Sequence, residues 1–300
     1  MTTMPAPDRT AYRRGLLFLL LSALGFSTSL VLANKALLAG ASPLTINLAR
    51  FIIASVLVFG FLKLTRRDVH APGSVVPAIV LGCLVLSLSL SYVSSTQYIP
   101  VSLAVLVFYT NPFMVALVAR ALDKTPLTPV RLLAMVVAFA GLGMALEIWN
   151  AFALDWRGVS LATLTALSLT GIYIVSGRAM RAIAPQTLSF QAFLAAAVIV
   201  ALITVLTGGP VWPQANTGWV WLALTGVFYA LGQGFIFSGI ALAGPVPSSL
   251  IMNLEPVFTI ALAVLLLGDR LGPVQALGAG LVIAAVYAVS RTGKAKPPAT

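Results

Sequence analysis

The sequence predicts an all-α polytopic membrane protein with ten transmembrane helices. Of its 300 residues, 60% are hydrophobic and 8% are charged, whereas a typical soluble domain has about 25% charged residues. Apolar segments of about 20 residues, long enough to cross a hydrocarbon core of about 30 Å, recur along the whole chain. Short loops rich in Pro, Gly and charge separate them, such as KLTRRDVHAPGS and LDKTPLTP. This alternation leaves no segment for a soluble domain.

Ten spans follow in order from these segments. The first begins like a secretory signal peptide, but its apolar run exceeds the usual length of about 7–15 residues. Because similar segments follow it, we predict that it remains in the mature protein as the first helix. The tails are residues 1–14 and 292–300. The predicted spans are 15–36, 43–63, 74–97, 100–121, 129–149, 158–180, 186–207, 217–242, 246–267 and 272–291.

The basic residues orient the spans, because Lys and Arg concentrate in cytoplasmic loops. With a cytoplasmic N-terminus, the inner segments carry 14 of the 18 basic residues, and the outer loops carry Lys35, Arg157 and Arg270. Arg50 alone lies within a span. This distribution predicts that both termini are cytoplasmic and that the number of spans is even. The net charge of +11 is then a topology signal, and no nucleic-acid partner is predicted.

The two halves of the chain, 15–149 and 158–291, resemble each other. TNPFMVALVARALDKTPLTPV aligns with LEPVFTIALAVLLLGDRLGPV at a constant offset of 144 residues, which places Pro112 opposite Pro256. Each half contains five predicted spans, and an odd number of spans inverts the second half in the membrane relative to the first. Inverted repeats of this kind are common in secondary transporters, whose substrate sites lie near the midplane between the repeats.

Glu255 and Pro256 are unusual residues for the centre of the ninth span. A charged side chain at that depth costs about 2.5–3.5 kcal/mol on insertion scales, and it normally faces the bundle interior or a wet cavity. Pro256 has no N–H group, so the carbonyl of Met252 loses its helical partner. The equivalent pair in the first half is Asn111 and Pro112. We predict hinges at the two prolines and a central space lined by Glu255, with a structural carboxyl group as the alternative role.

Other polar side chains in the spans are candidates for lining the same space. Serines of the third span share one face beside Tyr92, although Ser also promotes helix packing in lipid. Tyr229 and Gln233 of the eighth span are four residues apart and therefore share a face. For each residue taken alone, a structural hydrogen bond is the competing role. The predicted substrate-binding residues are Ser91, Tyr92, Ser95, Tyr109, Asn111, Tyr173, Tyr229, Gln233, Asn253 and Glu255.

Arg50 lies in the second span, about 11 Å from its outer end at 1.5 Å per residue. We expect it to extend toward the headgroups or to pair with a buried acid, and we leave it outside the substrate-binding set. Small residues repeat every four positions along the tenth span, at Ala276, Gly280, Ala284 and Ala288. Such tracks allow close helix contacts and predict a scaffold or dimer interface, so the protein is expected to be a monomer or a homodimer.

The residue inventory argues against an enzyme. One cysteine, Cys83, and one histidine, His70, are too few for a metal site of four soft ligands, and they allow no disulfide within the chain. Rhomboid-like serine proteases need an intramembrane histidine, and aspartyl proteases need two intramembrane acids, whereas Glu255 stands alone. We predict no enzymatic activity, no metal and no cofactor.

Several motifs together resemble the drug/metabolite transporter superfamily, and most closely its EamA-like bacterial exporters. These motifs are ARFIIA in the second span, FYTNPFMVALVARAL in the fourth, and NLEPVFTIALAVLLLGDRLGPVQALGAGLVI across the ninth and tenth. The family often has an acidic residue after the fourth span, where Asp123 is slightly displaced here. The resemblance implies export of metabolites, amino acids or toxic compounds from the cytoplasm through a central cavity.

These observations predict a secondary transporter of the bacterial inner membrane that works by alternating access. Its expected partners are a small-molecule substrate and the lipid bilayer, and protons are the candidate coupling ion, with Glu255 as their site. A passive small-solute channel or a membrane sensor is the alternative.

Overall fold

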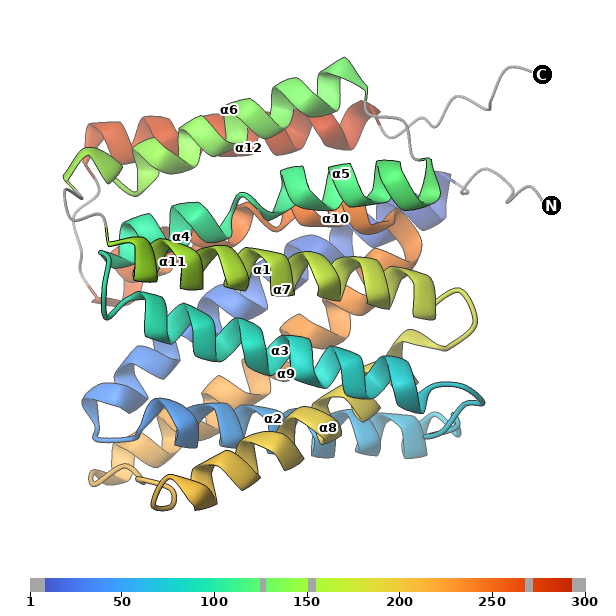
Figure 1. Cartoon of the computed structure of the whole chain (residues 1–300), viewed down its shortest axis with the longest axis vertical. Coiled ribbons are helices and arrows are strands. Elements are labelled where there is room, and N and C mark those ends of the chain that lie inside the picture. The colour runs from blue at the N-terminus through green and yellow to red at the C-terminus, as the bar shows by residue number, and fades with distance from the viewer. Residues whose placement is uncertain (1–8, 125–127, 151–154, 268–271, 293–300) are drawn as a thin grey trace.

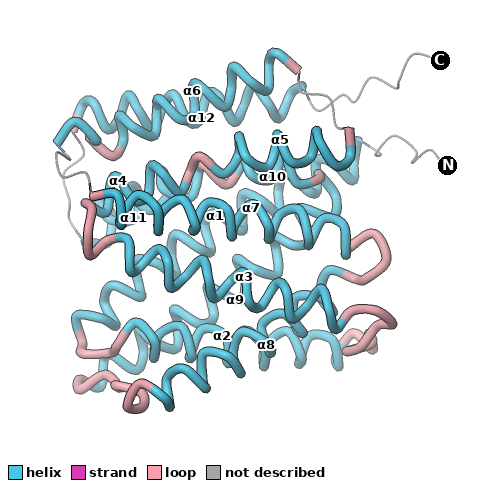
Figure 2. Tube along the Cα trace, in the orientation of Figure 1, coloured by secondary structure: helices cyan, strands magenta, loops and turns pink. Residues whose placement is uncertain are grey.

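The computed structural model describes residues 9–124, 128–150, 155–267 and 272–292, which form a bundle of α-helices without strands. Most helices run along one direction of the molecule (Figure 1), and apart from short breaks inside the bundle the loops lie at its two ends (Figure 2). The helices are α1 (Arg9–Leu38), α2 (Pro43–Leu64), α3 (Val75–Ser95), α4 (Val101–Phe108), α5 (Asn111–Asp123), α6 (Pro129–Ala145), α7 (Trp156–Ala179), α8 (Pro185–Leu206), α9 (Asn216–Ala243), α10 (Pro245–Ile251), α11 (Leu254–Leu267) and α12 (Pro273–Thr292), with a 3₁₀ turn η1 (Ile148–Asn150) after α6.

The helices occupy the segments that hydropathy predicts. Within the described ranges, eight helices are long and apolar enough to cross a membrane, counting α4 and α5 together as one. The 17-residue α6 is a shorter apolar helix, and α10 with α11 fills the predicted ninth span. The protein is therefore an all-helical, multi-pass membrane protein.

The observed boundaries differ from the predicted ones at both ends of the first half. Helix α1 begins at Arg9, so the predicted tail 1–14 is already helical from that residue. Helix α6 ends at Ala145 instead of continuing to 149, because Glu147 adopts a left-handed backbone with φ 48° and the 3₁₀ turn follows. Residues 1–8, the tail residues 293–300 and residues 268–271, which include the predicted outer-loop residue Arg270, lie outside the described residues.

Helices from the two halves pack against each other in matched pairs. Helix α1 packs along α9, and their counterparts α7 and α3 pack together, while α6 and α12 form a layer at one edge of the bundle (Figure 1). Close approaches repeat in the same way. A Cβ atom added at Gly15 would lie 2.9 Å from Leu242 Cβ, and one added at Gly158 would lie 2.9 Å from Tyr98 Cβ. Each contact joins a residue of one half to a residue of the other, and the two contacts correspond in the internal repeat. Gly158 follows Gly15 by 143 positions, and Leu242 follows Tyr98 by 144.

Candidate functional site

The helix that fills the fourth predicted span is broken between α4 and α5. Pro112 has no N–H group to donate to the carbonyl of Phe108, four residues earlier. The side chain of Asn111 replaces that donor, because its Nδ2 donates to the Phe108 carbonyl at 3.1 Å. The break at Tyr109 and Thr110 is thus stabilised by the residue that precedes the proline.

The ninth predicted span is broken at the equivalent place, between α10 and α11. Here the carbonyl of Met252, left free by Pro256, accepts the backbone N–H of Glu255 at 3.0 Å. Helix α1 also contacts this break, because the Ser27 hydroxyl lies 2.7 Å from the backbone carbonyl of Glu255 and shares its single proton between that oxygen and the Ala23 carbonyl of α1. The Glu255 side chain is therefore not needed to satisfy the broken backbone.

The Glu255 side chain instead lies among tyrosines in the bundle interior. The Tyr109 hydroxyl donates to the Glu255 carboxyl group. Tyr92, Tyr173 and Tyr229 lie close enough to interact with it electrostatically. Tyr109 and Tyr173 are buried, whereas Glu255, Tyr92 and Tyr229 keep partial exposure. The cluster thus brings one carboxyl group and four phenols together inside the bundle, from four helices and the break between α4 and α5.

Tyr229 is held by packing and by a hydrogen bond. Its ring centroid lies 5.6 Å from those of Phe26 and Phe51 and 6.3 Å from that of Phe193, so the ring is enclosed by aromatic neighbours from three helices. The Nε2 of Gln233 donates to the Tyr229 hydroxyl at 3.0 Å. The predicted pair Tyr229 and Gln233 therefore lies on one face and acts as a unit.

Arg50, which is not among the predicted substrate-binding residues, lies beside this group. Its guanidinium carbon lies 5.4 Å from the centroid of the Tyr229 ring, and it interacts electrostatically with Glu255. Sequence position indicates only the depth of Arg50 in its span. Its direction is set by the packing of α2 against α9, which brings together residues about 180 positions apart.

Two of the predicted serines pack between helices. Ser91 is buried, and its hydroxyl lies 2.8 Å from the hydroxyl of Thr165 on α7. Ser95 is fully buried and donates to the carbonyl of Tyr92 at 2.6 Å. Both hydroxyls are thus engaged within the protein, which agrees with the packing role expected for this serine stripe.

The two predicted asparagines are buried beside the helix breaks. Asn111 and Asn253 each have an Oδ1 atom that is buried without a hydrogen-bond partner in the structure. Buried acceptors of this kind are uncommon, since most buried polar atoms are paired. The two amide oxygens are therefore acceptors that the described protein leaves unpaired beside the two breaks.

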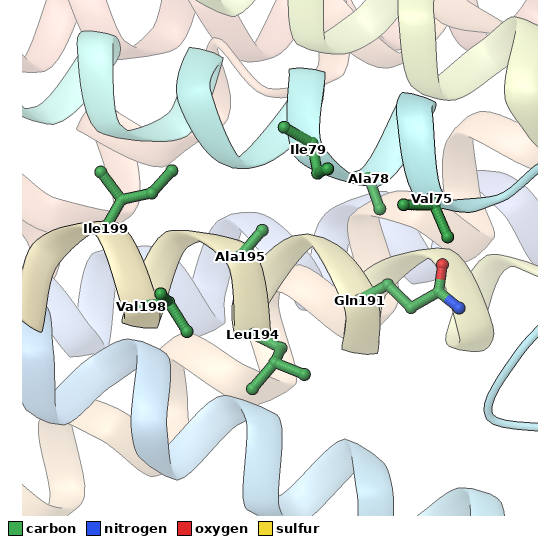
Figure 3. A pocket seen from close by; sticks show the side chains of 8 residues that line it. All are labelled: Val75, Ala78, Ile79, Gln191, Leu194, Ala195, Val198 and Ile199. Carbon is green, nitrogen blue, oxygen red and sulfur yellow. The ribbon is translucent and has the colours of Figure 1, made fainter.

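Two hollows in the described structure lie away from this cluster. The first, of about 380 Å³, lies between α3 and α8, and Figure 3 labels its lining residues. Its polar residue Gln191 donates to the Val69 carbonyl at 3.0 Å. A second, of about 200 Å³, lies where Arg178 and Arg181 bond to Asp123 at 3.1 and 3.4 Å. The first has apolar walls, and the second is lined by an ion pair that joins α5 to the end of α7. In the described part of the chain, no cluster of three or more His, Cys, Asp or Glu residues is suited to hold a metal ion.

The sequence profile of the EamA-like transporter family matches residues 13–146 and again residues 156–291. The chain belongs to the EamA-like transporter family. The two matches together span most of the sequence, and each begins close to the start of one predicted half. An EamA-like chain is a membrane transporter, within the drug/metabolite transporter superfamily that its motifs resemble.

Known relatives agree with membership of the EamA-like family. The threonine/homoserine exporter RhtA of Escherichia coli (strain K12) is 26% identical over 241 residues, which covers 79% of this chain and 78% of that protein. A solute carrier family 35 member B1 homolog of Drosophila melanogaster is 42% identical over 82 residues, which covers 27% of this chain and only 24% of that relative. A protein of known crystal structure superposes with a TM-score of 0.78 at 20% identity, covering 95% of this chain and 98% of the other. This last likeness concerns the fold alone.

Proposed function

We propose that this protein is a secondary transporter that exports small polar metabolites, such as amino acids, from the cytoplasm across the bacterial inner membrane. The proposed mechanism is alternating access at a site near the membrane midplane. The observation that carries the proposal is the convergence of Glu255 and four tyrosines beside two equivalent helix breaks. An intramembrane ionisable residue in such a place is a functional candidate in itself, and broken helices commonly form transporter sites.

The proposed topology has ten spans in two inverted repeats, residues 15–149 and 158–291, with both termini cytoplasmic. It is supported by the two family matches, by the matched packing of α1 with α9 and α3 with α7, and by the distribution of basic residues. In this arrangement Pro112 and Pro256 act as hinges when the halves rock about the site.

The relative RhtA supports amino acids as the class to examine first, because its name assigns it threonine and homoserine. Proteoliposomes that contain the purified protein are loaded with one unlabelled candidate amino acid at a time. The entry of the same amino acid in labelled form is then measured. We expect saturable uptake that rises when the same solute is present on the opposite side. A growth-rescue screen in a sensitised bacterium, with amino acids, dipeptides and toxic cations as challenges, extends the search for the cargo.

The same preparation separates a carrier from a passive channel. A channel gives single-channel currents in a planar bilayer and flux that does not saturate. Flux of that kind, without stimulation from the opposite side, would contradict alternating access.

A further inference from the structure

This inference rests on the proposed transport function and concerns Arg50. Three helices fix the position of its side chain. Its Nη2 donates to the Ser29 carbonyl of α1 at 3.2 Å, and its guanidinium lies over the Tyr229 ring of α9. Ser29 is itself held, because its hydroxyl donates to the Thr225 carbonyl of α9 at 2.9 Å. The guanidinium therefore keeps a defined place in the bundle.

Arg50 retains hydrogen-bond donors that the protein does not use. A guanidinium carries five N–H donors, and its described hydrogen bond occupies one of them. Its Nε is buried without a partner in the structure. An unpaired buried donor on a charged group is costly. The planar fork of arginine matches a carboxylate, which accepts two parallel hydrogen bonds from it.

Glu255 supplies the opposite charge but does not pair directly with Arg50. The two side chains interact electrostatically. Nevertheless, the direct ion pairs of the described residues join Asp123 to Arg178 and Arg181. Arg50 is held by Ser29 and Tyr229, whereas Glu255 is bonded to Tyr109. A cation from α2 and an anion from α11 thus lie within electrostatic reach of each other without forming a direct ion pair, and both interact with Tyr229.

We propose that Arg50 and Glu255 are the two poles of a site for a zwitterionic solute, with Arg50 binding its carboxylate and Glu255 binding its ammonium group. Tyr109 positions the Glu255 carboxyl group by its hydrogen bond. Aromatic faces attract cations, so Tyr92 and Tyr173 favour the ammonium end. Arg50 is then a specificity-determining residue, because a solute without a carboxylate leaves its charge unpaired in a low-dielectric interior.

The test compares solutes that differ only in one charged group. Purified full-length protein in detergent is titrated with L-threonine, L-leucine and L-phenylalanine, with their carboxamides, and with the amines that lack the carboxyl group. We expect the wild-type protein to bind at least one amino acid about tenfold more tightly than its carboxamide, since a charge-assisted bidentate contact is lost. Arg50→Gln should remove this preference, and Arg50→Lys should retain only part of it.

Two controls isolate the effect of Arg50. Lys35→Gln removes a cation whose ammonium lies 4.8 Å from the centroid of the Trp221 ring, away from the Glu255 cluster, and it should leave the preference unchanged. The thermal unfolding temperature without ligand shows whether each variant folds. If Arg50→Gln fails to fold, Arg50→Lys decides, because it keeps the charge and loses the fork.

The proposal is overturned if the wild-type protein binds no amino acid more tightly than its carboxamide, or if a folded Arg50 variant keeps the full preference. A failure of the transport proposal gives another result: the amino acid binds with the expected preference, but proteoliposomes show no stimulated exchange.

Discussion

Glu255 and Asn111 occupy equivalent positions before the two prolines, yet their side chains have different roles. Asn111 donates to the Phe108 carbonyl that its proline leaves free. At the second break the backbone N–H of Glu255 donates to the Met252 carbonyl. The Ser27 hydroxyl contacts the backbone carbonyl of Glu255. The first residue therefore stabilises the break, while the second keeps its carboxyl group for the interior. Because of this asymmetry, we propose Glu255 and not Asn111 as the site of proton coupling.

The variant Glu255→Gln tests that role, because glutamine preserves the size of the side chain and its ability to accept from Tyr109 but does not titrate. We expect uptake driven by an imposed pH gradient in proteoliposomes to fall at least about tenfold. Exchange of labelled for unlabelled solute should continue, but only at higher solute concentrations, because the variant also loses the charge that we propose binds the ammonium group. Glu147→Gln is the matched control, since Glu147 lies at the end of α6 outside the cluster. Unchanged pH dependence in Glu255→Gln would retire proton coupling at this site.

The sequence indicates which residues of the site are unusual, but it does not indicate where they point. Glu255 and Tyr109 are predictable because a carboxyl group and a proline break are expensive in the membrane centre. Ser91 is not, since serine serves packing and cavity lining equally well, and its Thr165 partner lies on another helix. Arg50 is missed for the same reason, because its neighbours Tyr229 and Glu255 are distant in sequence.

The two helix breaks beside the proposed site are predictable from the sequence. Hydropathy predicts continuous spans at 100–121 and 246–267, and the prolines predict interruptions within them. The structure has the interruptions at Tyr109 and Thr110 and at Met252 and Asn253. The exact ends of the helices are harder to predict from the sequence. At Glu147 a left-handed backbone follows the end of α6, although this conformation is usually adopted by glycine.

If the second break is a hinge, Pro256→Ala should slow transport without unfolding the protein. Alanine restores the N–H that bonds the Met252 carbonyl and favours a continuous helix by about 3 kcal/mol in intrinsic propensity. We expect the exchange rate in proteoliposomes to fall about tenfold, with an equal or higher unfolding temperature. Pro273→Ala is the control, because Pro273 lies in the first turn of α12, where proline is tolerated. Exchange at the wild-type rate in Pro256→Ala would exclude the hinge.

The contact between α1 and α9 leaves no room for a side chain at Gly25. A Cβ atom at Gly25 would lie 2.9 Å from the backbone nitrogen of Gly232, and backbone atoms move less easily than side chains. Gly25→Ala is therefore expected to destabilise the protein by about 1–3 kcal/mol, as overpacking does elsewhere. Gly60→Ala, where nothing lies within 4 Å of the added atom, should have little effect. Thermal unfolding in detergent measures the stability of each variant. Equal unfolding temperatures for Gly25→Ala and Gly60→Ala would contradict close packing at Gly25.

For the whole molecule, the arrangement of matched helix pairs agrees with the internal resemblance of the sequence. Equivalent glycines, Gly82 and Gly226, meet α8 and α2 respectively, and α8 and α2 are themselves equivalent helices. Pairing of this kind follows when two copies of one five-helix unit face each other. It is difficult to derive from sequence, because the alignment of the halves does not specify which helices touch.

Inversion of the halves is tested by single cysteines in a Cys83→Ser background, because the native Cys83 is exposed. Intact cells are treated with a membrane-impermeant maleimide, and the proposed topology places Gln97→Cys and Thr207→Cys outside and Thr65→Cys and Ala182→Cys inside. We expect the first two to react in intact cells and the last two only after permeabilisation, since the basic loops stay cytoplasmic. Each half then contributes one loop residue to each side. Reaction of Thr65→Cys and Thr207→Cys from the same side would mean that a span is missing between them, and the two helix breaks would no longer face each other across one site.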